Sequence, residues 1–162
     1  MTAVDRSRVA RIAEGVRDAI EAARDAKELR SEPLRGFPRA CCDDASDLLA
    51  QSLLENGIMV WCVGGTCYGR NPEDTQPHAW LELEDDTVID ITRDQFRLHP
   101  KPLRSDEPVY VGDPDTFCRQ FSVKRRDRFL GIEAYGEPAR SNLLAAYEVI
   151  KRHLTQALCD GA

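Results

Sequence analysis

The stretch HAWLELEDDTVIDIT, residues 78–92, decides the fold that we expect. Residues 79–84 and residues 87–92 each mix large apolar or β-branched side chains with polar ones, and the aspartates at 85–86 separate the two runs. Two runs of this kind joined by a tight polar turn are typical of a β-hairpin. We therefore predict an antiparallel hairpin with its turn at residues 85–86.

Two polar residues of this hairpin, His78 and Asp90, are twelve positions apart. A turn near residues 85–86 places them nearly opposite each other, and paired side chains on one face approach to roughly 5 Å at Cβ. At that distance a carboxylate can accept a hydrogen bond from an imidazole and fix its tautomer. The hairpin thus predicts a His–Asp pair. Asp94, just past the second strand, is an alternative partner.

Further strands and three helices surround the hairpin. Residues 58–63 form a short apolar run before Gly64-Gly65, and residues 109–111 form another, so both predict strands. Three- and four-residue apolar spacing predicts one helix over the first thirty residues, one over residues 42–55 and one near the C-terminus. The stripe of the first consists of Val9, Ile12, Val16, Ile20 and Ala23, and that of the last of Leu143, Tyr147, Ile150, Leu154 and Leu158. The order predicts a single α+β domain over residues 1–162, with an antiparallel sheet.

Cys42 stands at the predicted start of the middle helix. Unpaired backbone N–H groups and the positive end of the helix dipole stabilise a thiolate there, and they can also hold an oxyanion. Taken alone, a small buried thiol is the simpler interpretation, and the adjacent Cys41 is a second candidate nucleophile. Together with His78 and Asp90, however, the cysteine completes a set of nucleophile, base and orienting acid.

Composition excludes several classes of function. The 28 acidic residues outnumber the 22 basic ones and give a formal charge of −6, which argues against a general nucleic-acid binder. We interpret the basic stretch 124–128 as a solvated turn or helix face. No apolar run is long enough for a membrane span, and residues 1–6 lack an apolar signal region. We therefore expect a cytoplasmic protein with no membrane partner.

The six cysteines favour neither a disulfide framework nor a metal site. Thiols stay reduced in the cytoplasm, and a chain of this length can build its own core. There is no C-x-x-C pair, and His78 has no second histidine nearby, so structural zinc is disfavoured. We expect Trp80 to lie in the core and Glu82 to be a solvated strand carboxylate. The polar loop 69–76 and Gly64-Gly65 could border a substrate cleft or form plain surface.

Three segments resemble the transglutaminase-like branch of the papain-like cysteine enzymes. Residues 42–46 (CDDAS) with the leucines after them resemble the nucleophile helix of that superfamily, HAWLE at 78–82 is similar to its His-Ala-Trp-Val-Glu strand, and IDIT at 89–92 resembles the strand that carries its aspartate. The order Cys, His, Asp also matches. The run 94–96 (DQF) looks like that of a bacterial subgroup. The resemblance covers residues 37–96, somewhat over a third of the chain.

This resemblance implies a papain-like core in which the nucleophile helix packs on an antiparallel sheet between flanking helices. It implies that Cys42 is the nucleophile, His78 the general base and acid, and Asp90 the orienting acid. It also favours Cys42 over Cys41, because Cys42 directly precedes the matching DDAS segment. The expected activity is acyl transfer from an amide of a protein or peptide, as in a peptidase, a deamidase or a transglutaminase. No metal or organic cofactor is implied.

Two other functions remain open at this point. Arylamine N-acetyltransferases share the order Cys, His, Asp, although the chain is short for them, and acetylation of Cys42 by acetyl-CoA would identify that activity. A non-catalytic protein-binding module that keeps the fold would show ordinary thiol reactivity and would tolerate Cys42→Ala. The sequence does not indicate the substrate or the oligomeric state.

Overall fold

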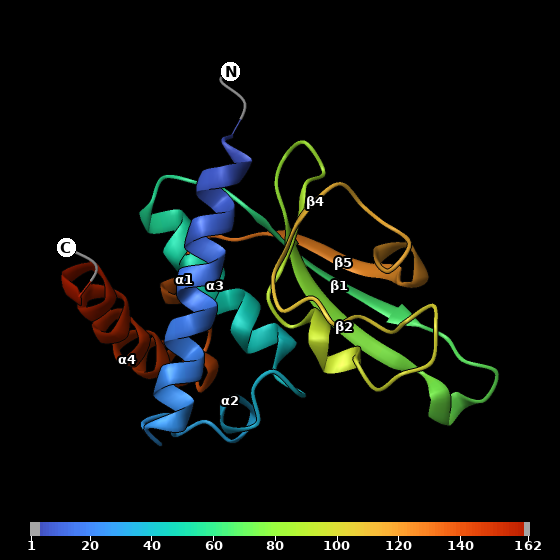
Figure 1. The fold of residues 1–162 in the computed structure, drawn as a ribbon, viewed down its shortest axis with the longest axis horizontal. Helices are drawn as coiled ribbons and strands as arrows, with labels where there is room; N and C mark the ends of the chain where they lie inside the picture. The colour runs from blue at the N-terminus through green and yellow to red at the C-terminus, as the bar shows by residue number, and fades with distance from the viewer. Residues whose placement is uncertain (1–3, 161–162) are drawn as a thin grey trace.

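A layer of helices lies beside a β-sheet in the computed structural model (Figure 1). The structure describes residues 4–160, with side chains through residue 155, so Leu158 of the predicted stripe and the Cys159 side chain lie outside the described part. The helices are α1 (Arg6–Asp25), α2 (Glu32–Arg35), α3 (Cys42–Glu55) and α4 (Ala139–Asp160). None of the helices within residues 4–160 has the length and apolar character needed to cross a bilayer.

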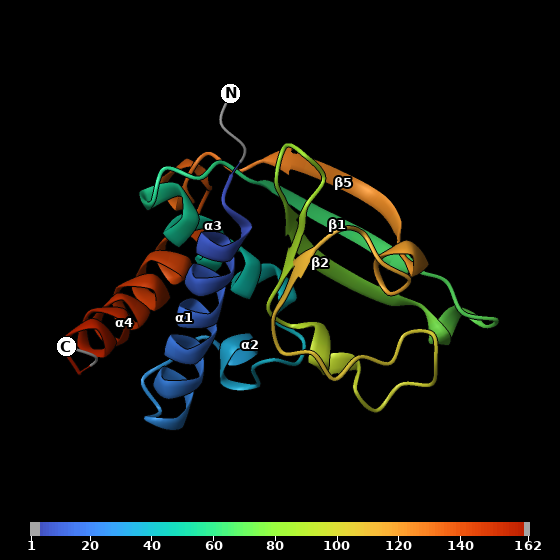
Figure 2. The ribbon, with the colours of Figure 1, turned by 45° about the horizontal axis from the view of Figure 1, so that its top comes forward.

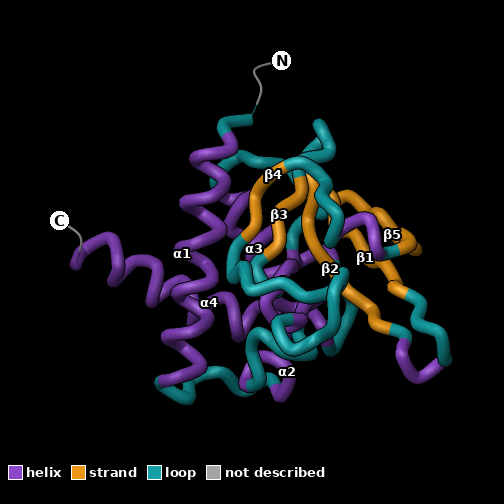
Figure 3. The backbone as a smooth tube through the Cα atoms, turned by 45° about the vertical axis from the view of Figure 1, so that its right-hand side comes forward, coloured by secondary structure: helices purple, strands orange, loops and turns teal. Residues whose placement is uncertain are grey.

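The sheet has five strands, all paired antiparallel, in the order β4-β3-β2-β1-β5 (Figure 3). The strands are β1 (Trp61–Cys67), β2 (Gln76–Glu82), β3 (Val88–Asp90), β4 (Tyr110–Gly112) and β5 (Ser122–Arg128). The predicted α+β class with an antiparallel sheet is therefore confirmed.

Helix α3 connects the helices to the sheet, because it packs on β2 and also contacts α1 and α4. Its apolar face, with Leu48, Leu49 and Leu53, is fully enclosed in the main core. Strand β2 divides its side chains between two cores, as the two-residue period of a strand requires. Leu81 belongs to the core shared with the helices, whereas Trp80 belongs to a second, mostly aromatic cluster. Helix α3, which begins at Cys42, therefore packs directly on β2, the strand that carries His78.

Helix α1 is shorter than the sequence predicts. The Asp5 carboxylate caps its start by accepting from the Ser7 N–H at 2.9 Å. The helix ends at Asp25 because Lys27 adopts a φ of 59°, and the Glu28 N–H then donates back to the Ala23 carbonyl. This return bond satisfies a carbonyl at the helix end.

Two predictions about segments of the sheet are wrong. The first strand does not end before Gly64-Gly65 but begins at Trp61 and runs through both glycines to Cys67. The basic stretch 124–128 is neither a turn nor part of a helix, since it belongs to edge strand β5. It is solvated as expected, and every residue of β5 is exposed. A strand with no buried face shows no apolar alternation, which explains why the pattern gave no strand signal.

The paired glycines of β1 differ in what a side chain would meet. A Cβ at Gly65 would lie 3.0 Å from Trp80 and 3.0 Å from Phe121, both in the aromatic cluster. A Cβ at Gly64 would meet the long, exposed Arg125 side chain at 2.8 Å. We expect Gly65→Ala to lower the free energy of unfolding by about 1–3 kcal/mol, as overpacking does. Because Arg125 can move aside, Gly64→Ala should lower it less. Urea unfolding of both variants measures this difference, and equal losses would contradict it.

Candidate active site

His78 and Asp90 form a buried pair. The His78 Nε2 lies 2.7 Å from Asp90 Oδ2, and each residue is 3% exposed. Strand pairing joins Leu81 to Ile89, and that register continued along the hairpin puts Trp80 opposite Asp90. We had expected His78 and Asp90 to be nearly opposite each other, but the register makes them a diagonal pair. Both side chains still point to the same face of the sheet.

The Asp90 carboxylate is fixed on both oxygens. Its Oδ1 accepts from the Thr92 N–H at 2.9 Å, while Oδ2 faces His78. Asp94 does not reach the histidine, because its carboxylate oxygens each lie 2.8 Å from the Arg17 guanidinium. Of the two aspartates that the sequence offered, the structure places Asp90 beside His78.

The two adjacent cysteines have different surroundings. Cys42 is the first residue of α3, is partly exposed, lines the same cavity as His78 and contributes to raising the pKa of that imidazole. Cys41 is only 2% exposed, and burial, together with the nearby Cys42 and Asp44, raises the pKa of its thiol to about 12. Since the thiolate is the reactive form, Cys42 is the better placed nucleophile of the two.

The environment of His78 favours the imidazolium in spite of burial. The aromatic rings around it have centroids 5.2–5.9 Å from its own, and they belong to Trp80, Phe96, Phe117 and Phe121. Burial lowers the pKa of His78, but the charge of Asp90 and its hydrogen bond, together with Cys42, outweigh that effect and raise the pKa to about 9. A protonated His78 beside Cys42 would stabilise a thiolate.

Gln95 contacts the other nitrogen of the ring. Its Nε2 lies 3.2 Å from His78 Nδ1 and donates to the Thr92 carbonyl at 3.0 Å. Because the ionised Asp90 can only accept, Nε2 of the histidine carries a proton, and Nδ1 of the neutral ring is an acceptor that faces the Gln95 amide. In the sequence, Gln95 is marked only by its place in the DQF run, which does not indicate a contact with His78.

Arg93 is a second residue that the sequence analysis missed. It is 1% exposed, with Nε 3.7 Å from Asp90 Oδ2 and Nη1 2.7 Å from Asp115 Oδ2. Its guanidinium carbon lies 3.7 Å from the centre of the Tyr110 ring. The i to i+3 spacing from Asp90 is the only signal in the sequence, and it does not distinguish a buried arginine from a solvated one.

A cavity of about 720 Å³ opens in front of Cys42 and His78. Gly64 and Gly65 line it, as does Gln76, whereas residues 69–75 of the preceding loop do not. Its remaining lining residues are Ala40, Asp43, Pro77, Gln95, Lys124 and Arg125. Cys42 and His78 thus lie at the cavity wall, while the contact between His78 and Asp90 behind them is buried.

Trp80 and Glu82 also lie on β2, and the sequence predicted a buried position for the first and a solvated one for the second. Trp80 is 3% exposed and stays in the core, as predicted. Glu82 is not a solvated carboxylate, because its side chain is only 15% exposed. It accepts from the Trp80 indole at 3.1 Å and from Arg126 at 2.9 Å. The strand β5 that supplies Arg126 was not predicted, which is why the burial of Glu82 was missed.

Asp47, one and a half turns after Cys42, has a pKa raised to about 6 by burial, although a hydrogen bond from Tyr135 at 2.7 Å opposes the shift. The folded chain therefore binds this proton more tightly than the unfolded chain, and the resulting stability is present below about pH 4 and lost as the pH rises through 6. We expect the free energy of unfolding of Asp47→Asn, relative to that of wild type, to increase by roughly 2 kcal/mol when the pH is raised from 4 to 7. Urea unfolding at the two pH values measures this, and parallel pH profiles would contradict it.

Among the side chains that the structure describes, Cys41, Cys42, Cys62, Cys67 and Cys118 are free thiols, and no three His, Cys, Asp or Glu residues cluster as a metal site would require. No protein-family model matches the chain, and neither a curated protein nor a solved structure is detectably similar to it.

Proposed function

We propose that this chain is a cysteine-dependent acyl-transfer enzyme that acts on amide bonds through Cys42, His78 and Asp90. The observation that carries the proposal is the buried 2.7 Å contact between His78 and Asp90, with Cys42 beside the same ring at a cavity. A helix that begins at the nucleophile and packs on an antiparallel sheet supports a papain-like or transglutaminase-like core.

The first half of the reaction forms a thioester. The Cys42 sulfur gives its proton to Nδ1 of His78, whose Nε2–H stays bonded to Asp90. The thiolate attacks the amide carbon, and N–H groups in the first turn of α3, which have no intrahelical acceptor, face the developing oxyanion. His78 then returns the proton to the leaving nitrogen, the C–N bond breaks and the amine departs.

The second half releases the acyl group. His78 takes a proton from water or from an acceptor amine, which attacks the thioester carbon and restores the Cys42 thiol. Water yields hydrolysis and an amine yields transfer. We favour hydrolysis, because water needs no second substrate site. We also place the protein in the cytoplasm, where a nucleophilic thiol stays reduced.

Site-resolved alkylation by iodoacetamide tests the proposal. The rate at each cysteine is measured by mass spectrometry from about pH 5 to about pH 9, a range around the reference thiol pKa of about 8.5. We expect Cys42 to label fastest near pH 6, and we expect His78→Ala to remove that advantage, because the thiolate loses its imidazolium partner. Cys67, which is also partly exposed, serves as the internal control.

Equal rates at Cys42 and Cys67 that do not respond to His78→Ala would refute the catalytic proposal. In that case the interpretation of the chain as a protein-binding module would replace it. Labelling of Cys42 by acetyl-CoA would instead identify a thioester-dependent N-acyltransferase.

A further inference from the structure

We propose that the substrate is an extended acidic polypeptide segment, which pairs with the free edge of β5 and whose carboxylates lie against Lys124 and Arg39 beside Cys42. This inference rests on the proposed function and specifies its substrate class. Three features carry it: an open strand edge, cations without acidic partners and two adjoining cavities at the same place.

Strand β5 ends the sheet next to the candidate active site. It pairs with β1 on one side, and the described chain provides no strand on the other (Figure 2). All seven of its residues are exposed, and Lys124 and Arg125 also line the Cys42 cavity. The outer edge of such a strand presents unpaired N–H and C=O groups, which can pair with an added extended chain.

The charge of β5 is opposite to that of the whole chain. Its seven residues carry four bases and one acid, whereas acidic residues outnumber basic ones 28 to 22 overall. Some of this charge is compensated, since Arg125 pairs with Asp43, and Arg126 pairs with Glu82 and Asp86.

Lys124 has no carboxylate partner among the described side chains. Its ammonium lies instead 5.1 Å from the centre of the Tyr68 ring. Arg128, at the other end of β5, likewise forms no ion pair within the described residues. These two cations stand along the exposed edge without an acid, so an acidic segment on that edge would gain contacts that the chain itself does not supply.

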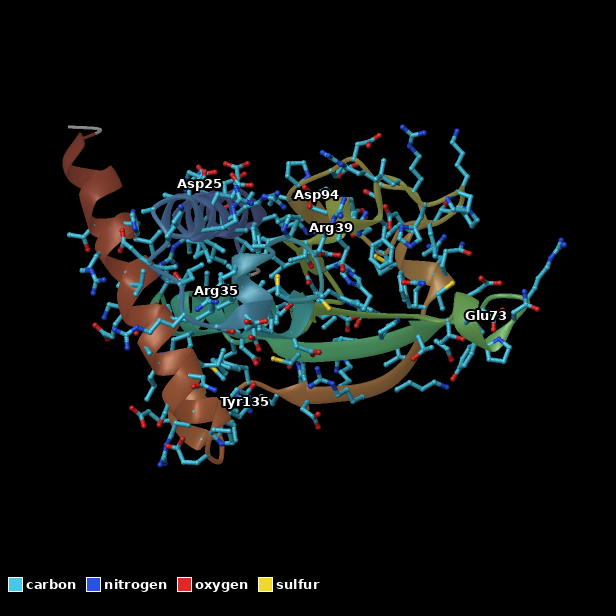
Figure 4. The ribbon with its side chains drawn as sticks, turned by 90° about the horizontal axis from the view of Figure 1, so that it is seen from below. Asp25, Arg35, Arg39, Glu73, Asp94 and Tyr135 are labelled. Carbon is cyan, nitrogen blue, oxygen red and sulfur yellow. The ribbon has the colours of Figure 1, made fainter. Side chains whose placement is uncertain are left out.

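Arg39 provides positive charge on a second side. It lines a cavity of about 340 Å³ that shares Gln76 and Gln95 with the Cys42 cavity. Arg39 is exposed and has no carboxylate partner among the described side chains. Figure 4 shows Asp94 close to Arg39 in that view and Glu73 at the far tip of the β1–β2 connection, but both carboxylate oxygens of Asp94 are already bonded to Arg17. A segment that reaches Cys42 therefore lies between unpaired cations.

Three probes separate charge from strand pairing. They are peptides of equal length with the same terminal chloromethyl ketone, one with glutamates, one with glutamines at those positions and one with glutamates on an N-methylated backbone. The rate of Cys42 alkylation is measured for each at low and at high salt and divided by the rate with iodoacetamide, so that thiol reactivity cancels. Iodoacetate serves as the small-anion control.

We expect the glutamate peptide to react about tenfold faster than the glutamine peptide at low salt, and the advantage to shrink at high salt because exposed charges are screened. N-methylation should remove most of the gain, since it removes the backbone donors that strand pairing needs. Lys124→Glu and Arg39→Glu should each lower the glutamate preference severalfold. Lys151→Glu, an exposed lysine on α4, is the matched control and should preserve it.

Equal rates for the glutamate and glutamine peptides, with His78-dependent iodoacetamide labelling intact, would overturn this inference and leave the proposed function standing. Two results would show that the site recognises a small anion rather than a polypeptide segment. One is full reactivity of the N-methylated peptide, and the other is a preference for iodoacetate over iodoacetamide as large as that for the glutamate peptide over the glutamine peptide. Loss of the His78-dependent labelling itself would refute the proposed function, and this inference with it.

Discussion

Asp90→Asn slows the alkylation of Cys42 near pH 6 by a factor on the order of 10² or more, because the amide removes two functions of the carboxylate. The negative charge that raises the pKa of His78 against burial is lost, so that the buried ring stays neutral. The amide can also donate to Nε2, which moves the ring proton to Nδ1 and leaves no acceptor for the thiol proton. Mass spectrometry of the labelled chain measures the rate.

Asp94→Asn is the matched control, since Asp94 lies four residues further along the chain and contacts Arg17 rather than His78. It should leave the Cys42 rate within about twofold of wild type, which is small beside the loss at Asp90. Near-UV circular dichroism of both variants establishes that they fold. If the two substitutions slowed alkylation equally, or if neither did, Asp90 would have no role in orienting His78.

The sequence was sufficient to predict the local parts of the candidate site. Helix α3 runs from Cys42 to Glu55 as expected, because its apolar spacing is helical and Asn56-Gly57 favours a stop. The hairpin placed His78 and Asp90 on one face because a strand alternates every two residues, and an error in the register did not change that face. Such features depend on short-range periodicity, which a single sequence records.

What the sequence could not predict depends on residues distant in the chain. Strand β5 pairs with β1 across about sixty positions and buries no side chain, so neither periodicity nor composition marks it. The burial of Glu82 follows from that missed strand, since Arg126 is its partner. Arg93 is enclosed by Tyr110 and Asp115, which come from segments much further along the chain.

Arg93→Met lowers the free energy of unfolding by about 3–5 kcal/mol, because it leaves the acids around a buried cation uncompensated. Asp90 is fully enclosed and would keep only His78 as a neighbouring cation, while Asp115 would lose a 2.7 Å partner. Arg93→Lys keeps the charge but not the planar stack on Tyr110, so its loss should be smaller. Urea unfolding near pH 7 measures the free energy of unfolding of wild type, Arg93→Met and Arg93→Lys.

The pH dependence of this loss identifies its origin. Burial alone would raise the pKa of Asp90, but the charge of His78 and its hydrogen bond, the Thr92 N–H and the charge of Arg93 together outweigh it and hold that pKa below its usual value. A carboxylate of this kind contributes stability that is present above its unfolded pKa of about 3.9 and is lost as the pH falls through the folded pKa. The difference in free energy of unfolding between wild type and Arg93→Met should therefore be largest near neutral pH and should shrink below pH 4.

Arg125→Met, which breaks only the exposed pair with Asp43, should change stability by at most about 1 kcal/mol at either pH. If Arg93→Met destabilised the fold equally at both pH values, the lost packing on Tyr110 rather than the lost charge would explain the effect.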